Sequence, residues 1–175
     1  GQICITETYD TKNHVGQTLV IDLINAEETV NVNIGGDEFI NDDGTVSSTS
    51  WMMFNASGDE PIQIYIDPND TLGLGTRGTY VQQSDGSVVS EDIPNFVHFG
   101  HELIHAWRDI NGFFVNSWEE VGLIQCDAPR LWREEELQTM GINYTVGGVS
   151  SYNYNSYNGI ISENGLRLEN GLNTR

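Results

Sequence analysis

Hydrophobic residues in the first ninety positions fall into short runs that partly alternate with polar residues. Three runs, at residues 18–24, 29–35 and 62–67, are rich in β-branched side chains and are bounded by Gly, Asn and Asp. Such alternation is typical of short strands, and the bounding residues are typical of turns. The pattern therefore predicts a twisted sheet of several short strands.

The pattern changes to helical spacing after residue 90. Apolar residues of this part recur at helical rather than alternating intervals: Phe96, Val97, Leu103, Ile104 and Trp107. Ser90 or Asp92 can cap the start, Pro94 suits the first turn, and Gly112 can end the helix. We expect one helix between these boundaries.

Three further segments complete the chain. A second helix is predicted over residues 128–140, where Gly141 ends it. Residues 142–160 are rich in Tyr, Asn, Ser and Gly, which predicts a loop. A short last helix follows, with Ser162 as its N-cap.

The chain is strongly acidic, with a formal net charge of −19 and seven Lys plus Arg. Such a surface repels phosphates and anionic lipids, so we expect no nucleic acid and no membrane as a partner. No run approaches the about 20 apolar residues of a membrane span, and no secretory leader is visible. The acidic turns offer oxygen ligands for calcium, but none forms a complete calcium loop. Cys4 and Cys126 permit either one disulfide or two free thiols.

The helix predicted between its cap at Ser90 or Asp92 and its end at Gly112 carries His101 and His105 four residues apart, with Glu102 between them. Residues i and i+4 lie on one face of a helix, so both imidazoles can bind one metal ion. Glu102 then lies close enough to activate a water molecule, as in hydrolytic zinc sites. The alternative is an ordinary helix with a buried, hydrogen-bonded histidine and a solvated glutamate. The amphipathic setting favours the zinc site.

A catalytic zinc ion needs a third protein ligand. No histidine follows His105, and Arg108 stands where the elongated form of the motif has glycine, so the sequence favours a carboxylate. The downstream candidates are Asp109, Glu119, Glu120, Asp127, Glu134, Glu135 and Glu136.

The candidates differ in where the predicted helices place them. Asp109 lies a full turn beyond His105 and suits a contact with a ligand rather than with the metal. The acidic run on the second helix can approach from across a cleft. There we favour Glu135 over Glu136, because Thr139, four residues later, can orient the Glu135 carboxylate.

Three motifs, in this order along the chain, resemble zinc metallopeptidases of family M91: "HELIHAWRDINGFF", "EELQTMGI" and "SENGLRLENGLNTR". The resemblance covers roughly residues 62–175. It implies an α+β, zincin-like fold, in which a short twisted sheet packs on the motif helix and a second helix carries the third ligand. It also implies one zinc ion per chain. The family includes secreted bacterial effectors and Rhs-type toxin domains, so we expect a protein substrate and secretion or translocation into a target cell.

The resemblance also implies a mechanism of peptide-bond hydrolysis. Glu102 takes a proton from water and passes it to the leaving amine. Arg167 is the first candidate donor to the oxyanion, and the alternative is a structural ion pair with Glu163, one turn earlier. Tyr144 is the next candidate, followed by three tyrosines of the predicted loop: Tyr152, Tyr154 and Tyr157. Arg175 suits packing or substrate contact, and the strand at residues 62–67 is expected to be the edge strand that pairs with the substrate.

The length suits one domain. We treat residues 1–175 as a single, monomeric zinc metallopeptidase domain, with a β-rich part at 1–60 and a catalytic part at 61–175. Two other functions remain open: a β-rich module that binds protein or glycan and holds a structural zinc, and a protease that processes its own polypeptide.

Overall fold

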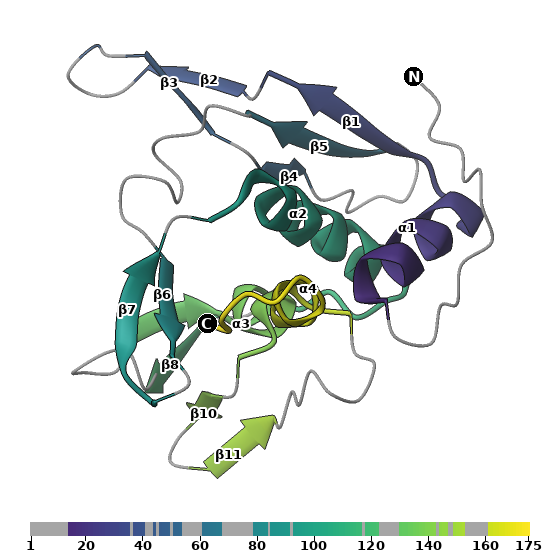
Figure 1. Ribbon diagram of the computed structural model, residues 1–175. Coiled ribbons are helices and arrows are strands. Elements are labelled where there is room, and N and C mark those ends of the chain that lie inside the picture. Colours follow the sequence, from purple (N-terminus) through teal and green to yellow (C-terminus); the bar gives the residue numbers. More distant parts are fainter. Residues whose placement is uncertain are drawn as a thin grey trace.

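The computed structural model describes residues 14–35, 37–40, 44, 46–49, 51–53, 61–67, 79–83, 85–91, 93–116, 118–122, 130–142, 144–146, 149–152 and 161–175. Within these residues the fold is mixed α+β, with four helices and eleven strands (Figure 1). Cys4 and Cys126 lie outside the described residues. None of the described helices has the length and apolarity needed to cross a membrane.

The main sheet contains three strands in the order β1-β5-β4. β1 (Val30–Ile34) runs parallel to β5 (Ile62–Ile66), and β4 (Trp51–Met53) pairs with the other side of β5 in the antiparallel sense. The predictions of strands at 29–35 and 62–67 are therefore confirmed. However, β5 is the central strand, so the expectation that it forms the edge of the sheet is wrong. Both of its sides are already paired, because residues 51–53 add a strand that their sequence did not reveal.

The other strands form a second, four-stranded sheet and two separate hairpins. The sheet has the order β11-β10-β8-β9 and contains β8 (Trp118–Gly122), β9 (Arg130–Arg133), β10 (Tyr144–Val146) and β11 (Val149–Tyr152). The hairpins are β2 (Asp37–Ile40) with β3 (Val46–Thr49), and β6 (Thr79–Gln82) with β7 (Val88–Glu91). The predicted loop at 142–160 is thus wrong where β10 and β11 form, and residues 153–160 lie outside the described part of the chain.

Helix α1 (Val15–Asn25) replaces the strand expected at residues 18–24. Val15, Leu19 and Leu23 are spaced four residues apart and therefore share one helical face. Leu19 is fully buried in the core, and Val15 and Leu23 pack against it. This burial outweighs the β-branched composition of the segment, since tertiary contacts override local propensity.

Helix α2 (Asn95–Ile110) confirms the helix predicted after residue 90. Pro94 lies at its N-cap with extended backbone, and Gly112 follows its end with a φ of 70°. In Figure 1, α2 lies between the main sheet on one side and α3 and α4 on the other. Its close contact with α4 depends on Gly100, because a Cβ at this position would collide with the side chain of Leu166.

Helix α3 (Glu134–Met140) ends before Gly141 as predicted, but it begins six residues later than predicted because the preceding residues form β9. Gly141 adopts the left-handed conformation that ends such helices, with a φ of 74°. Helix α4 (Glu163–Glu169) confirms the last predicted helix, and Ser162 Oγ accepts a hydrogen bond from Gly165 N at 3.1 Å.

One hydrophobic core joins α1, α2, α4 and β5. Its buried members are Leu19, Ile62, Ile64, Leu103, Ile104, Ala106, Ile161 and Leu166. This core fixes α2 against the sheet and against α4, so the polar residues on the remaining face of α2 are held toward α3.

Candidate metal centre

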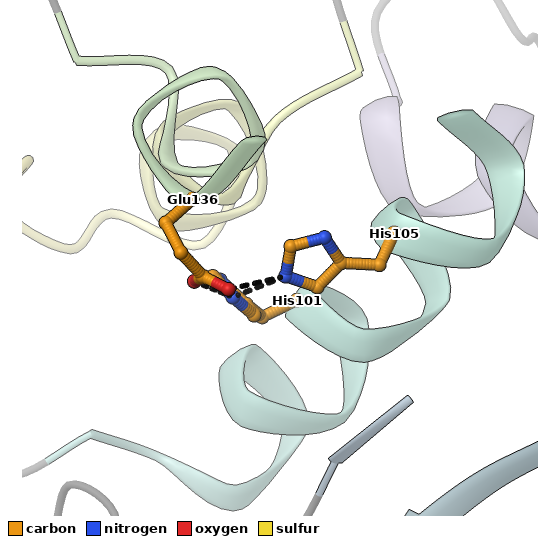
Figure 2. A group of neighbouring side chains, drawn as sticks. All are labelled: His101, His105 and Glu136. Atoms are coloured by element: carbon orange, nitrogen blue, oxygen red, sulfur yellow. Dashed lines mark hydrogen bonds and ion pairs between the residues drawn. The ribbon is translucent and has the colours of Figure 1, made fainter. Parts of the chain in front are cut away.

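Two histidines of α2 and one glutamate of α3 meet at a single point (Figure 2). Nε2 of His101 lies 3.2 Å from Oε2 of Glu136, and Nε2 of His105 lies 3.4 Å from Oε1 of the same carboxylate. The two Nε2 atoms are 3.0 Å apart. Ligand atoms that share one tetrahedral zinc ion at about 2.0–2.2 Å lie roughly 3.3–3.5 Å from one another. The three side chains are therefore already close to the spacing that a zinc ion requires.

The centre is buried on the histidine side and open on the glutamate side. The side chains of His101 and His105 are each 7% exposed, whereas that of Glu136 is 36% exposed. Solvent and a substrate can therefore approach the cluster past Glu136.

A buried carboxylate lies behind each histidine. Oε2 of Glu163 lies 2.9 Å from Nδ1 of His101, and Oε1 of Glu135 lies 3.2 Å from Nδ1 of His105. Histidine ligands of metals commonly donate their second N–H to a carboxylate, which fixes the ring and directs the other nitrogen at the metal. Both Nε2 atoms are therefore the ones presented to the cluster.

Arginines neutralise these two carboxylates. Arg167 Nε donates to Glu163 Oε1 at 2.8 Å, and Arg175 Nη1 donates to Glu163 Oε2 at 3.1 Å. Arg108 Nε donates to Glu135 Oε1 at 2.8 Å. Glu136 differs, because the contacts found for it among the described residues are with the two histidines.

The charges of the cluster shift its pKa values in a consistent direction. Burial lowers the pKa of His101, but Glu136 and Glu163 outweigh this effect and raise it to about 10. Burial raises the pKa of Glu136, but His101 and His105 hold it well below its ordinary value. Without a metal the carboxylates thus favour a proton on His101, so a cation entering the site has to displace that proton.

The two glutamates favoured from the sequence have different surroundings. Glu135 is 2% exposed and contacts Arg108, the backbone N–H of Val115 and Thr139, whose Oγ1 donates to Oε1 at 3.2 Å. The contact expected between Thr139 and Glu135 is therefore present. The carboxylate that faces both histidine Nε2 atoms is nevertheless that of Glu136, so the geometry favours the opposite order of preference for the third ligand.

Glu102 is buried, 7% exposed, and lies next to His101 in the chain. Its Oε1 is 3.8 Å from Nε2 of His98, one turn earlier on α2. His98 was not among the residues predicted for the site, although positions 98, 101, 102 and 105 follow the spacing of a single helical face. The contacts of Glu163 with His101 and of Arg108 with Glu135 were not predicted either, because they join residues far apart in the chain.

Arg167 makes the ion pair that was the alternative to an oxyanion role. Its side chain is 1% exposed and pairs with Glu163, while Nη1 donates to the Asn173 carbonyl at 3.3 Å. The backbones of Tyr144 and Tyr152 lie in β10 and β11, and the structure does not describe their side chains. Tyr154 and Tyr157 lie outside the described residues.

The remaining candidate ligands are not part of the cluster as described. Asp109 is half-buried, and burial together with the charges of Glu135 and Glu28 raises its pKa to about 6. The backbones of Glu119 and Glu120 lie in β8 without described side chains, and Asp127 lies outside the described residues.

The model of a family of peptidases, Peptidase_M91, described as "Effector protein", matches residues 2–175. The match extends over the first sixty residues, which the motif resemblance did not cover. Neither a curated protein nor a solved structure matches the chain.

Proposed function

Because the chain belongs to the M91 peptidase effector family, we propose that it is a zinc-dependent endopeptidase that cleaves a protein of a target cell. The observation that carries this proposal is the convergence of His101, His105 and Glu136 on one point. The architecture supports it, since two ligands on a long helix under a sheet and a third on a later helix are consistent with a zincin-like fold.

The donor set fits zinc better than calcium or magnesium. Two imidazole nitrogens and one carboxylate oxygen form the set found in hydrolytic zinc sites, whereas calcium and magnesium prefer oxygen ligands. When bound, zinc would supply a Lewis acid for the peptide carbonyl and for the attacking water. The exposed side of Glu136 supports a catalytic rather than a closed structural site, because a catalytic site keeps one position open.

The residues of the chain then have separate tasks. Glu102 accepts a proton from the attacking water and donates it to the leaving amine. Glu163 and Glu135 hold the rings of His101 and His105. Arg167 acts on Glu163 as a positioning residue, and Tyr144 remains our candidate for the donor to the oxyanion.

The description of the family as effectors supports delivery of the protein into a target cell, by secretion or translocation. We propose that its substrate there is a protein whose surface near the cleaved bond is neutral or basic. An acidic substrate would be repelled by the net charge of −19.

The test compares zinc content and proteolysis in four variants. Glu136→Gln is expected to lose zinc, and Glu102→Gln is expected to keep one zinc per chain while cleavage falls by at least about a hundredfold. Glu134→Gln, in the same acidic run, is the matched control that is expected to keep both zinc and cleavage. Glu135→Gln tests the preference of the sequence for Glu135 as the third ligand. A Glu102→Gln protein with wild-type cleavage would refute the mechanism, and a Glu136→Gln protein with full zinc would refute the ligand assignment.

A further inference from the structure

An apolar pocket lies where the ends of β1 and β5 meet the first turns of α2. Its volume is about 250 Å³, and the residues that line it include Ile34, Ile66, Asp67, Phe96, His98 and Phe99. Because β1 and β5 are parallel, their carboxyl ends lie at the same edge, where Ile34 and Ile66 are paired. The pocket is thus built from two strand ends and one helix, rather than from a single loop.

The mouth of this pocket exposes large apolar side chains. Ile34 is 74% exposed and Phe96 is 48% exposed. Single exposed apolar residues are ordinary on a surface, but here they surround a hollow with a mostly apolar lining. Binding of an apolar group in such a site is favourable, because it removes apolar surface from water.

His98 connects the pocket with the metal centre. It lines the pocket, and its Nε2 lies 3.8 Å from Oε1 of Glu102, the proposed proton acceptor. The turn around Phe96 and His98 lies about 9 Å along the helix axis from the midpoint of the two histidine ligands. An extended peptide advances about 3.3 Å per residue, so this distance corresponds to roughly three residues.

We propose that the pocket binds a large apolar side chain of the substrate, within about three residues of the scissile bond. This inference rests on the proposed peptidase function and adds a substrate preference to it. The volume is below the roughly 300–1,000 Å³ of pockets that hold whole small molecules, so it suits one side chain. The buried Asp67 in the wall disfavours an acidic side chain in the same place.

The chain offers matched variants for a test. Phe96→Ala and Ile34→Ala remove exposed side chains of the pocket, and both positions tolerate truncation because little core packing is lost. The controls are Phe113→Ala, which lies just beyond the other end of α2 and is 53% exposed, and Ile24→Ala on α1, which is 44% exposed.

The experiment starts with wild-type, zinc-loaded protein and a library of unstructured peptides from a digested proteome, with cleavage sites read by mass spectrometry. We expect enrichment of Phe, Leu, Met or Tyr at one position near the cleaved bond. Two synthetic peptides that differ by a large apolar residue or alanine at that position are then compared by kcat/KM. In Phe96→Ala and Ile34→Ala, kcat/KM is expected to fall about five- to tenfold for the apolar peptide and less than about twofold for the alanine peptide.

The outcomes separate this inference from the function on which it rests. Wild-type cleavage without apolar enrichment, or with basic residues enriched instead, overturns the pocket assignment and leaves the peptidase intact. An equal loss for both peptides, or an equal effect in Phe113→Ala, also overturns it, because a change in general stability would act in that way. A zinc-loaded wild type that cleaves no peptide refutes the proposed function itself and removes the inference with it.

Discussion

Replacing Glu163 by glutamine tests whether the buried carboxylate behind His101 controls both metal affinity and stability. Glu163 is 1% exposed and receives three contacts: His101 Nδ1 at 2.9 Å, Arg167 Nε at 2.8 Å and Arg175 Nη1 at 3.1 Å. Glutamine has nearly the same shape, so the substitution removes the charge and one acceptor without creating a cavity.

The magnitude follows from these contacts. In glutamine, an NH₂ group replaces one of the two carboxylate oxygens. This NH₂ has to face either Arg167 or the pair formed by His101 and Arg175, so a hydrogen-bond donor then lies against another donor. Loss of one partner from a buried ion pair costs about 3–5 kcal/mol. Loss of the carboxylate behind a histidine ligand lowers metal affinity about 10–100-fold. We therefore expect both effects in Glu163→Gln.

Two assays measure these effects separately. Urea unfolding in the presence of a chelator gives the free energy of unfolding of the metal-free protein, and competition with a chromophoric chelator gives the zinc Kd. Glu169→Gln, an exposed position on the same helix, is the control for both. A Glu163→Gln protein with wild-type zinc affinity would refute the idea that Glu163 orients His101, even if its stability falls.

Two further predictions concern the metal-free protein and the packing of α2. Because the pKa of His101 is raised, His101 adds stability that is complete below the ordinary histidine pKa of 6.5 and is lost as pH rises toward about 10. Because the pKa of Glu136 is lowered, Glu136 adds stability that is lost as pH falls below the ordinary glutamate pKa of 4.5. The free energy of unfolding of metal-free protein should therefore decrease from about pH 7 to about pH 10, and a constant value would contradict the charge arrangement. Gly100→Ala should destabilise the protein by about 1–3 kcal/mol because its Cβ meets Leu166. The loss in the double variant Gly100→Ala/Leu166→Ala should be smaller than the sum of the two single losses, and strict additivity would show that the two side chains do not meet.

The parts of the site that lie close together in the sequence were predictable. The histidine spacing, the helix that carries it and the cap at Ser162 depend on contacts within a few residues, and all three are present in the structure. The choice between Glu135 and Glu136 was different, because neighbouring residues on a helix point about 100° apart. Their directions depend on how α3 is oriented against α2, which no local pattern records.

The errors in the fold have the same origin. Residues 18–24 have the composition of a strand, but they form α1 because Leu19 is buried against other elements. The strand at residues 62–67 was expected at an edge, but the short β4 pairs with its second side. In both cases contacts between elements decide the outcome rather than local composition: Leu19 packs against residues far along the chain, and β5 is paired on its second side by β4, which directly precedes it.

The distribution of positive charge is a second reason, besides the spacing of the three ligand atoms, to propose Glu136 as the metal ligand. The chain contains seven Lys plus Arg. Of these, Arg108 forms an ion pair with Glu135, and Arg167 and Arg175 form ion pairs with Glu163. These two carboxylates are therefore already neutralised and serve to hold the histidine rings. Glu136 has no arginine among its described contacts and keeps its negative charge beside two Nε2 atoms. A divalent cation that displaces the proton from His101 supplies positive charge at this point, so the carboxylate that no arginine neutralises is the one expected to bind it.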